Sequence, residues 1–112
     1  EGVRPEQIVF VGNVMIDALR HALPRAEATG HAAAHGAPGR HVVVTLHRPS
    51  NVDVPERLAQ LAAALRALAE ERPVLFPAHP RTQDRLAAAG LDLGAVRVTP
   101  PVGYFEMLDL VR

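Results

Sequence analysis

Short apolar runs and longer amphipathic stretches alternate along this chain of 112 residues. Four apolar runs, at residues 8–11, 42–46, 74–76 and 96–99, are rich in β-branched side chains and predict strands. The stretches between them predict helices, because their apolar residues recur every three or four positions. A strand followed by a helix, repeated along the chain, is typical of an α/β fold.

The helix predicted from residue 55 to about residue 71 has the clearest pattern. Its apolar stripe consists of Leu58, Leu61, Ala62, Leu65, Leu68 and Ala69. Asp53 and Glu56 form a capping-box pattern at its start, and Pro55 lies in the first turn, where proline is tolerated. Such a one-sided stripe predicts a helix that packs on a sheet.

Three other helices are predicted mainly from their end signals. Asn13 is suited to cap a helix that ends before Pro24. Thr82 is suited to cap a helix that ends at Gly90, and residues 104–111 predict the start of another.

Polar residues follow three of the predicted strands, in residues 47–51, 79–82 and 100–104. Short connections imply a parallel sheet with right-handed crossovers. The carboxyl ends of parallel strands meet along one edge, where α/β proteins bind ligands. The pattern therefore predicts a ligand site made from these loops.

The first of these loops combines His47 and Arg48 with the neutral donors Ser50 and Asn51. Imidazole and guanidinium groups suit phosphate or carboxylate recognition. The structural alternative is that His47 caps the strand while Arg48 pairs with a surface carboxylate.

The second loop repeats the combination with His79 and Arg81, and Pro77 and Pro80 restrict the backbone on both sides of His79. A rigid histidine at a strand end suits binding. A buried histidine that donates to a backbone carbonyl would have the same local sequence, and both interpretations stay open.

Composition narrows the range of functions. The formal net charge is +0, which gives no argument for a nucleic-acid or acidic-membrane partner. There is no cysteine, which excludes disulfides and thiolate metal sites. No apolar run approaches the length of about 20 residues that spans a bilayer.

Other chemistry has weak support in the sequence. Neither glycine-rich phosphate fingerprint occurs. His31 and His35 stand four residues apart but lack acidic partners nearby, so we expect no metal site. Glu106 and Asp109 are expected on a solvated helix face. An apparent start at Glu1, without Met, and a final helix that reaches Arg112 lead us to expect a fragment.

Four motifs, in order along the chain, resemble those of the non-hydrolysing UDP-N-acetylglucosamine 2-epimerases. They are GNVMIDAL at residues 12–19, VTLHRPSNVD at 44–53, FPAHPRT at 76–82 and PVGYF at 101–105. The resemblance covers nearly the whole chain except the connection at residues 24–40.

The resemblance implies part of a GT-B-type two-domain fold, in which two Rossmann-like halves close over a nucleotide-sugar. Residues 1–112 would begin the second, UDP-binding half. Residues 1–23 would form a hinge-side strand and helix. Residues 24–40, rich in Ala, Gly, His and Pro, predict a flexible connection with a possible short helix near Glu27. Residues 41–112 would form a three-layer β-α-β-α-β-α core.

The resemblance also implies a reaction. The family interconverts UDP-GlcNAc and UDP-ManNAc by eliminating UDP and adding it back with the opposite configuration at C2, without metal or other cofactor. It implies that His47 is catalytic and contacts the diphosphate. Arg48, Val102 and Met107 match further substrate contacts, the last two at the uracil ring.

In regulated members of the family, the positions of Arg48 and His79 touch a second UDP-GlcNAc. Those members carry Arg and Glu where this chain has Pro49 and Ser50, which argues against regulation here.

The family's acid–base carboxylates belong to the first domain, so we expect this chain alone to be inactive. The resemblance implies that the parent is a cytoplasmic, homodimeric isomerase that binds a UDP-sugar and serves cell-surface polysaccharide biosynthesis. The alternatives are a GT-B-type glycosyltransferase, a hydrolysing epimerase, or a non-catalytic nucleotide-binding module.

Overall fold

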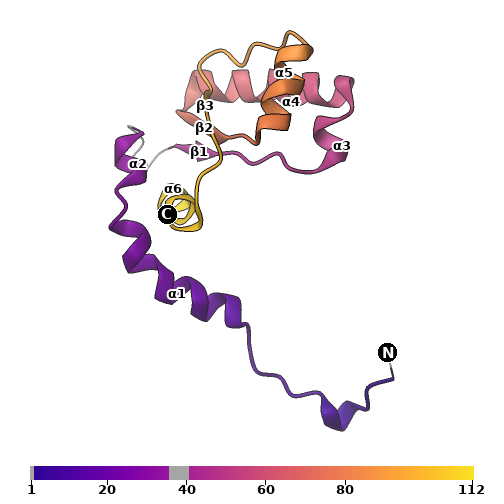
Figure 1. The fold of residues 1–112 in the computed structure, drawn as a ribbon, viewed down its shortest axis with the longest axis vertical. Helices are drawn as coiled ribbons and strands as arrows, with labels where there is room; N and C mark the ends of the chain where they lie inside the picture. The colour runs from indigo at the N-terminus through magenta and orange to yellow at the C-terminus, as the bar shows by residue number, and fades with distance from the viewer. Residues whose placement is uncertain (1, 36–40) are drawn as a thin grey trace.

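Three parallel strands form the centre of the molecule in a computed structural model that describes residues 2–35 and 41–112 (Figure 1). They are β1 (Val42–Val43), β2 (Val74–Pro77) and β3 (Arg97–Thr99), and β2 lies between the other two. Val42 pairs with Val74, and Leu75 pairs with Arg97. The predicted α/β class with a parallel sheet is confirmed.

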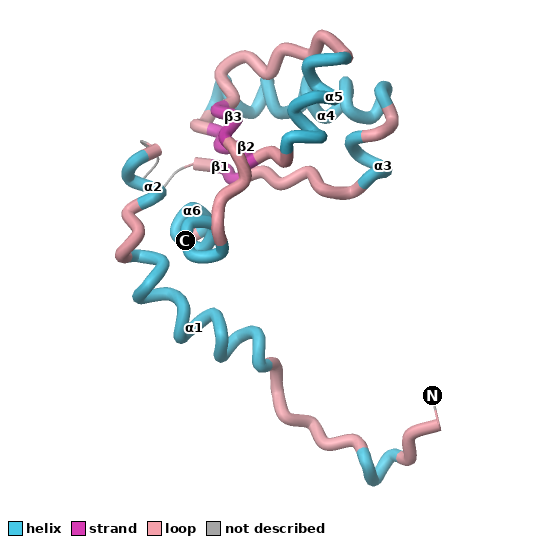
Figure 2. Tube along the Cα trace, in the orientation of Figure 1, coloured by secondary structure: helices cyan, strands magenta, loops and turns pink. Residues whose placement is uncertain are grey.

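Helices cover both faces of this sheet, which makes three layers (Figure 2). On one face lie α4 (Pro55–Glu71) and α5 (Pro80–Ala88), and on the other lies α6 (Tyr104–Val111). The one-turn helix α3 (Pro49–Val52) comes between β1 and α4.

The alternation of side chains along β2 divides the core in two. Val74 and Phe76 point to the α4 and α5 side, where they pack with Leu58, Ala62 and Leu86 among others. Leu75 points the other way and packs with Leu110 of α6. Because β2 is buried on both faces, its sequence is continuously apolar rather than alternating.

The amino-terminal part reaches the core through α1 (Val14–Glu27) and the short α2 (His31–Ala34). Ala22 and Ala26 are buried on α1, which packs against α6. The guanidinium of Arg25 lies 4.4 Å from the centre of the Phe105 ring. Small residues on α1 therefore let the two helices approach closely.

The strand predicted at residues 8–11 is absent, and that prediction is wrong. This segment is extended but pairs with no strand of the described residues, and Phe10 is 95% exposed. It follows the 3-10 turn η1 (Pro5–Gln7) and runs away from the core, as Figure 1 shows. The radius of gyration is accordingly 18.0 Å, compared with about 13 Å for a compact chain of this size.

The helix that begins at Val14 does not stop before Pro24, as predicted, but continues to Glu27 with Pro24 inside it. The buried face continues to Ala26, and the N–H of Ala28 still donates to the Pro24 carbonyl, 3.3 Å away. Packing against α6 therefore outweighs the bond that proline removes. The rest of the predicted connection contains α2, and residues 36–40 lie outside the described residues.

Two predicted caps are also wrong. Val54, not Asp53, precedes α4, and no side chain caps it. His79, not Thr82, caps α5, and Thr82 is 2% exposed. The strand predicted at residues 42–46 is confirmed only for Val42–Val43.

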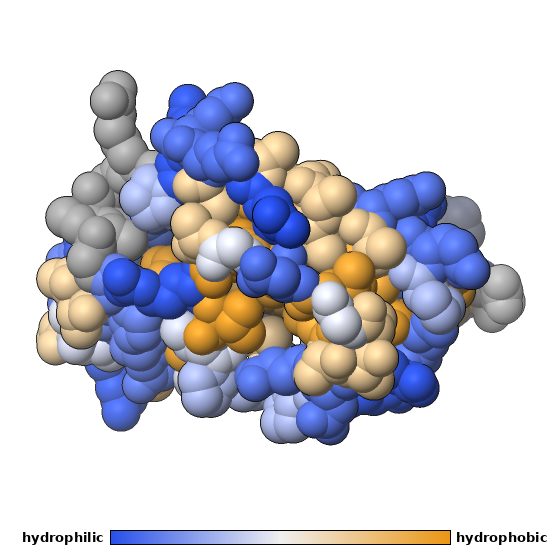
Figure 3. Space-filling view, turned by 90° about the horizontal axis from the view of Figure 1, so that it is seen from above, coloured by the Kyte–Doolittle hydropathy of each residue, from blue (hydrophilic) through white to orange (hydrophobic). Residues whose placement is uncertain are grey.

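The α4 and α5 side of the molecule has a mixed surface. In Figure 3 apolar residues show in the middle of the face seen from above, with hydrophilic residues around them.

The stripe predicted on α4 is confirmed in part, since Leu58 and Ala62 are buried and Leu65, Leu68 and Ala69 pack partly buried against them.

Candidate functional site

The loops after β1 and β2 leave the sheet at the same end, where the carboxyl ends of the parallel strands lie. The N–H of Val44 donates to the Leu75 carbonyl at 2.9 Å, and the N–H of Ala78 donates to the Thr99 carbonyl at 2.9 Å. These bonds continue the parallel pairing beyond the strands themselves. They bring the start of the His47 loop and the start of the His79 loop to one end of the sheet.

A cavity of about 250 Å³ lies between these two loops. It is lined by His47, Pro49, Val52, His79, Arg81 and Thr82. The site predicted from three loops is therefore found for two of them. The loops after β1 and β2 meet at one end of the sheet, whereas no residue of 100–104 lines the cavity. The cavity combines two imidazoles and a guanidinium and suits an anionic group.

His79 is fixed by its role as the cap of α5. The N–H of Arg81 donates to His79 Nδ1, with 3.2 Å between the two nitrogens. Because Nδ1 accepts this bond, the proton of the neutral imidazole is on Nε2. His79 is exposed, so this nitrogen is free to donate to a ligand rather than being used inside the core.

An ion pair joins the two loops. Asp53, at the end of α3, lies with its Oδ2 2.6 Å from Nη2 of Arg81, and with its Oδ1 3.7 Å from Nε of Arg85. The hydroxyl of Thr82 lies 3.5 Å from the Leu46 carbonyl and provides a second, longer contact. Sequence reasoning assigned Asp53 to a helix cap. It missed this ion pair, because the partner Arg81 is 28 residues away along the chain.

The other predicted substrate contacts lie away from this cavity. Arg48 is exposed at the start of α3 and does not line it. Val102 packs partly buried against Leu75 and Leu110. Met107 is half-buried in α6, where its N–H donates to the Gly103 carbonyl. The structure thus brings His47 and His79 together but not the other three.

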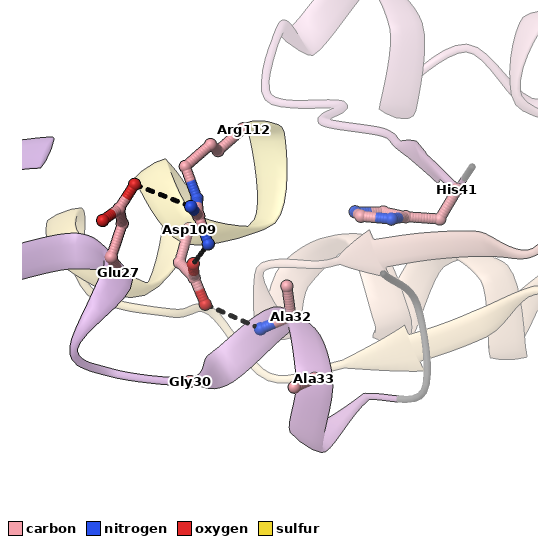
Figure 4. A pocket seen from close by; sticks show the side chains of 7 residues that line it. All are labelled: Glu27, Gly30, Ala32, Ala33, His41, Asp109 and Arg112. Carbon is pink, nitrogen blue, oxygen red and sulfur yellow. Dashed lines mark hydrogen bonds and ion pairs between the residues drawn. The ribbon is translucent and has the colours of Figure 1, made fainter. Parts of the chain in front are cut away.

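Asp109 is buried, so the expectation that it lies on a solvated helix face is wrong. It is 2% exposed and accepts a hydrogen bond of 2.9 Å from the N–H of Ala32. Arg112 lies 3.2 Å from Asp109 and 2.7 Å from Glu27 (Figure 4). The Ala32 N–H and, next, the Arg112 guanidinium hold the pKa of this carboxyl below its ordinary value against the effect of burial.

These groups line a second cavity, of about 390 Å³, between α1, α2 and α6. Its polar groups are largely satisfied by one another, since Arg112 contacts both carboxylates. The sequence offered no signal for this cluster, because Ala32 and Asp109 are 77 residues apart.

Within residues 2–35 and 41–112, no group of three or more His, Asp or Glu residues is arranged to hold a metal ion. The rings of His31 and His35 lie 4.3 Å apart between centres. None of the described helices is both long and apolar enough to cross a membrane.

Comparison with known proteins decides the family. Residues 1–112 match the family described as UDP-N-acetylglucosamine 2-epimerase. The chain belongs to this family. The resemblance seen in its four motifs is therefore confirmed.

Two relatives illustrate the range within the family. The UDP-2,3-diacetamido-2,3-dideoxy-D-glucuronate 2-epimerase of Pseudomonas aeruginosa is 39% identical over 95% of this chain and 29% of its own length. The UDP-N-acetylglucosamine 2-epimerase of Methanococcus maripaludis is 31% identical over 100% of this chain and 34% of its own length. The chain thus spans about a third of the length of these relatives.

Solved structures agree. The UDP-GlcNAc 2-epimerase of Methanocaldococcus jannaschii superposes with a TM-score of 0.82 at 31% identity, over 97% of this chain and 33% of that one. Its complex with UDP-GlcNAc and UDP superposes with a TM-score of 0.71 at 30% identity, over 95% of this chain and 32% of that one. The fold class predicted from the sequence is confirmed.

Proposed function

We propose that this chain is part of the UDP-binding half of an enzyme that interconverts UDP-GlcNAc and UDP-ManNAc. The observation that carries the proposal is the cavity that His47 and His79 line together at the carboxyl ends of adjacent strands. A solved relative is described as a complex with UDP-GlcNAc and UDP, which supports a UDP-sugar as the ligand.

In this proposal, His47 donates to the diphosphate while the bond between C1 and the UDP oxygen breaks. A base supplied outside this segment removes the C2 proton, and the electron pair forms the C1–C2 double bond of a 2-acetamidoglucal. Re-addition of UDP to C1, with protonation of C2 from the opposite face, completes the epimerisation. A donor preorganised for the departing charge stabilises the transition state more than the ground state.

Further substrate contacts belong to the proposal on the strength of the motifs. Arg48, Val102 and Met107 are included as contacts to the nucleotide, and Arg48 and His79 as possible contacts to a second UDP-sugar. We also infer that the enzyme is a cytoplasmic homodimer whose product serves cell-surface polysaccharide biosynthesis. Light scattering of the complete protein tests the dimer.

The test uses the complete protein that the reading frame encodes, incubated with UDP-GlcNAc in D₂O and followed by proton NMR. We expect UDP-ManNAc to appear and deuterium to enter at C2. Free ManNAc would instead indicate a hydrolysing epimerase, and no reaction without an acceptor sugar would favour a glycosyltransferase.

A substitution of His47 tests the role of the cavity. His47→Ala should lower kcat by about 10²–10³-fold, the effect of removing one transition-state donor. His21→Ala, a change at an exposed position of α1, is the matched control and should leave kcat unchanged. Equal activity of the two variants would remove His47 from the mechanism.

A second candidate substrate follows from the 39% identity to the Pseudomonas aeruginosa enzyme. In that case the complete protein would epimerise UDP-2,3-diacetamido-2,3-dideoxy-glucuronate and leave UDP-GlcNAc unchanged. Parallel assays with the two UDP-sugars distinguish these candidates, because both carry the same UDP group and differ in the sugar.

A further inference from the structure

Arg81 lines the same cavity as His47 and His79, and its guanidinium is ion-paired with Asp53. The Arg81 side chain is 57% exposed, whereas that of Asp53 is 27% exposed. An ion pair of this exposure contributes little to stability. Its position at the edge of a cavity therefore suggests a different use.

The start of α5 has few backbone donors left for an anion. Pro80 has no N–H, and the N–H of Arg81 donates to His79 Nδ1. The N–H groups of Thr82 and Gln83 donate to the His79 carbonyl at 2.8 and 3.1 Å. An anion in this cavity must therefore be bound by side chains rather than by these amides.

The backbone that carries the Asp53 carboxylate is itself held in place. Its own N–H donates to the Pro49 carbonyl at 2.8 Å, and it lies between the end of α3 and the start of α4. Oδ1 is buried and makes no hydrogen bond among the described residues, apart from the ion-pair contact with Arg85. Asp53 thus presents its carboxylate from a hydrogen-bonded backbone, and the more exposed guanidinium of Arg81 is bound to it.

A guanidinium has five N–H donors in one plane. The contact of 2.6 Å uses Nη2 of Arg81, which restricts the orientation of that plane and leaves other donors for a ligand. His79, which lines the same cavity, adds its Nε2–H donor. Together they form a donor set suited to a group with several anionic oxygens.

We propose that Arg81 is an anion-binding residue of this site and that Asp53 positions its guanidinium for the diphosphate of the ligand. The identity of that ligand as a UDP-sugar rests on the proposed function. The roles of the two residues rest on the ion pair and on the cavity.

The experiment is a thermodynamic cycle of affinities, measured by titration calorimetry on the complete protein with UDP and, separately, inorganic pyrophosphate. Arg81→Gln should weaken both ligands by about 10-fold, because a charge-assisted contact is lost. Asp53→Asn should weaken them by about 3-fold in the wild-type background and by less than about 1.5-fold when combined with Arg81→Gln. The control, Arg66→Gln on the exposed side of α4, should leave affinity unchanged.

The non-additivity is the readout that a merely structural role of Asp53 would not produce. Denaturation curves of each variant show whether a loss of affinity comes from unfolding. Additive effects would refute the positioning role of Asp53, and unchanged affinity in Arg81→Gln would refute the binding role of Arg81.

Failure of the proposed function has a different signature. If the wild type binds pyrophosphate through Arg81 but not UDP, the anion site stands and the nucleotide assignment is wrong. If His47→Ala weakens UDP binding while Arg81→Gln does not, the UDP site stands and the role of Arg81 is wrong. Binding of neither ligand would overturn both.

Discussion

Two phenylalanines with opposite environments provide a direct test of the fold. Phe76 is 0% exposed at the centre of β2, while Phe10 is 95% exposed in the extended segment before α1. The substitution Phe→Ala removes the same atoms at both positions. Any difference in its effect on the free energy of unfolding therefore comes from the surroundings of each ring.

The expected magnitude follows from burial. A buried phenylalanine covers about 150–250 Å², and its replacement by alanine in a core costs about 3–5 kcal/mol. At this chain length, 1 kcal/mol corresponds to about 4 °C in Tm, so Phe76→Ala should lower Tm by about 12–20 °C. Phe10→Ala should change the free energy of unfolding by less than about 0.5 kcal/mol.

Urea denaturation monitored by circular dichroism measures both variants under the same conditions. Since Phe76→Ala removes a large part of a total stability of about 5–15 kcal/mol, Phe76→Leu is measured as well and should cost about 1–2 kcal/mol. A loss at Phe10 as large as that at Phe76 would show that residues 8–11 are packed. A loss below about 1 kcal/mol for Phe76→Ala would refute the central place of β2.

Three further changes test local features. Asp109→Asn should lower Tm at neutral pH, because the wild-type carboxyl has a lowered pKa in the folded state. The contribution of this carboxylate to the free energy of unfolding is present above the unfolded pKa of about 3.9. It is lost as pH falls through the folded pKa. Stability measured from pH 6 to pH 2 should therefore fall less steeply for the variant, and parallel curves would contradict this. Ala26→Leu should cost about 1–3 kcal/mol by overpacking the contact between α1 and α6, whereas no change in urea midpoint would place that residue outside the contact. Gly90→Ala should cost about 1–2 kcal/mol, because residue 90 has φ +61° with open space around it, and an unchanged midpoint would mean that the turn relaxes.

The layer order was predictable because it depends on local periodicity. The continuous apolar run of β2 predicts a strand buried on both faces, and the stripe on α4 predicts a helix and the face it buries. The order of these elements then implies a parallel sheet, and this in turn implies that the loops carrying His47 and His79 meet.

The failures share a physical cause, which is the presence or absence of a partner distant in sequence. The sequence predicts Asp53 as a helix cap, whereas in the structure it pairs with Arg81, 28 residues later. The sequence predicts Asp109 on a solvated face, whereas in the structure it is buried and accepts a hydrogen bond from the N–H of Ala32. Residues 8–11 have the composition of a strand but no neighbouring strand among the described residues. The sequence predicts that the helix ends before Pro24, whereas α1 continues to Glu27 because it packs against α6.

The sequence by itself determined the α/β class, the parallel sheet, the two polar loops at its edge and the motifs that mark the epimerase family. These depend on residues close to one another in the chain. Only the tertiary structure decided which side chains share the cavity, which carboxylates are buried and how Arg81 is oriented. Ion pairs and backbone donors act over distances of about 3–4 Å in space, and the sequence does not specify which distant residues come that close.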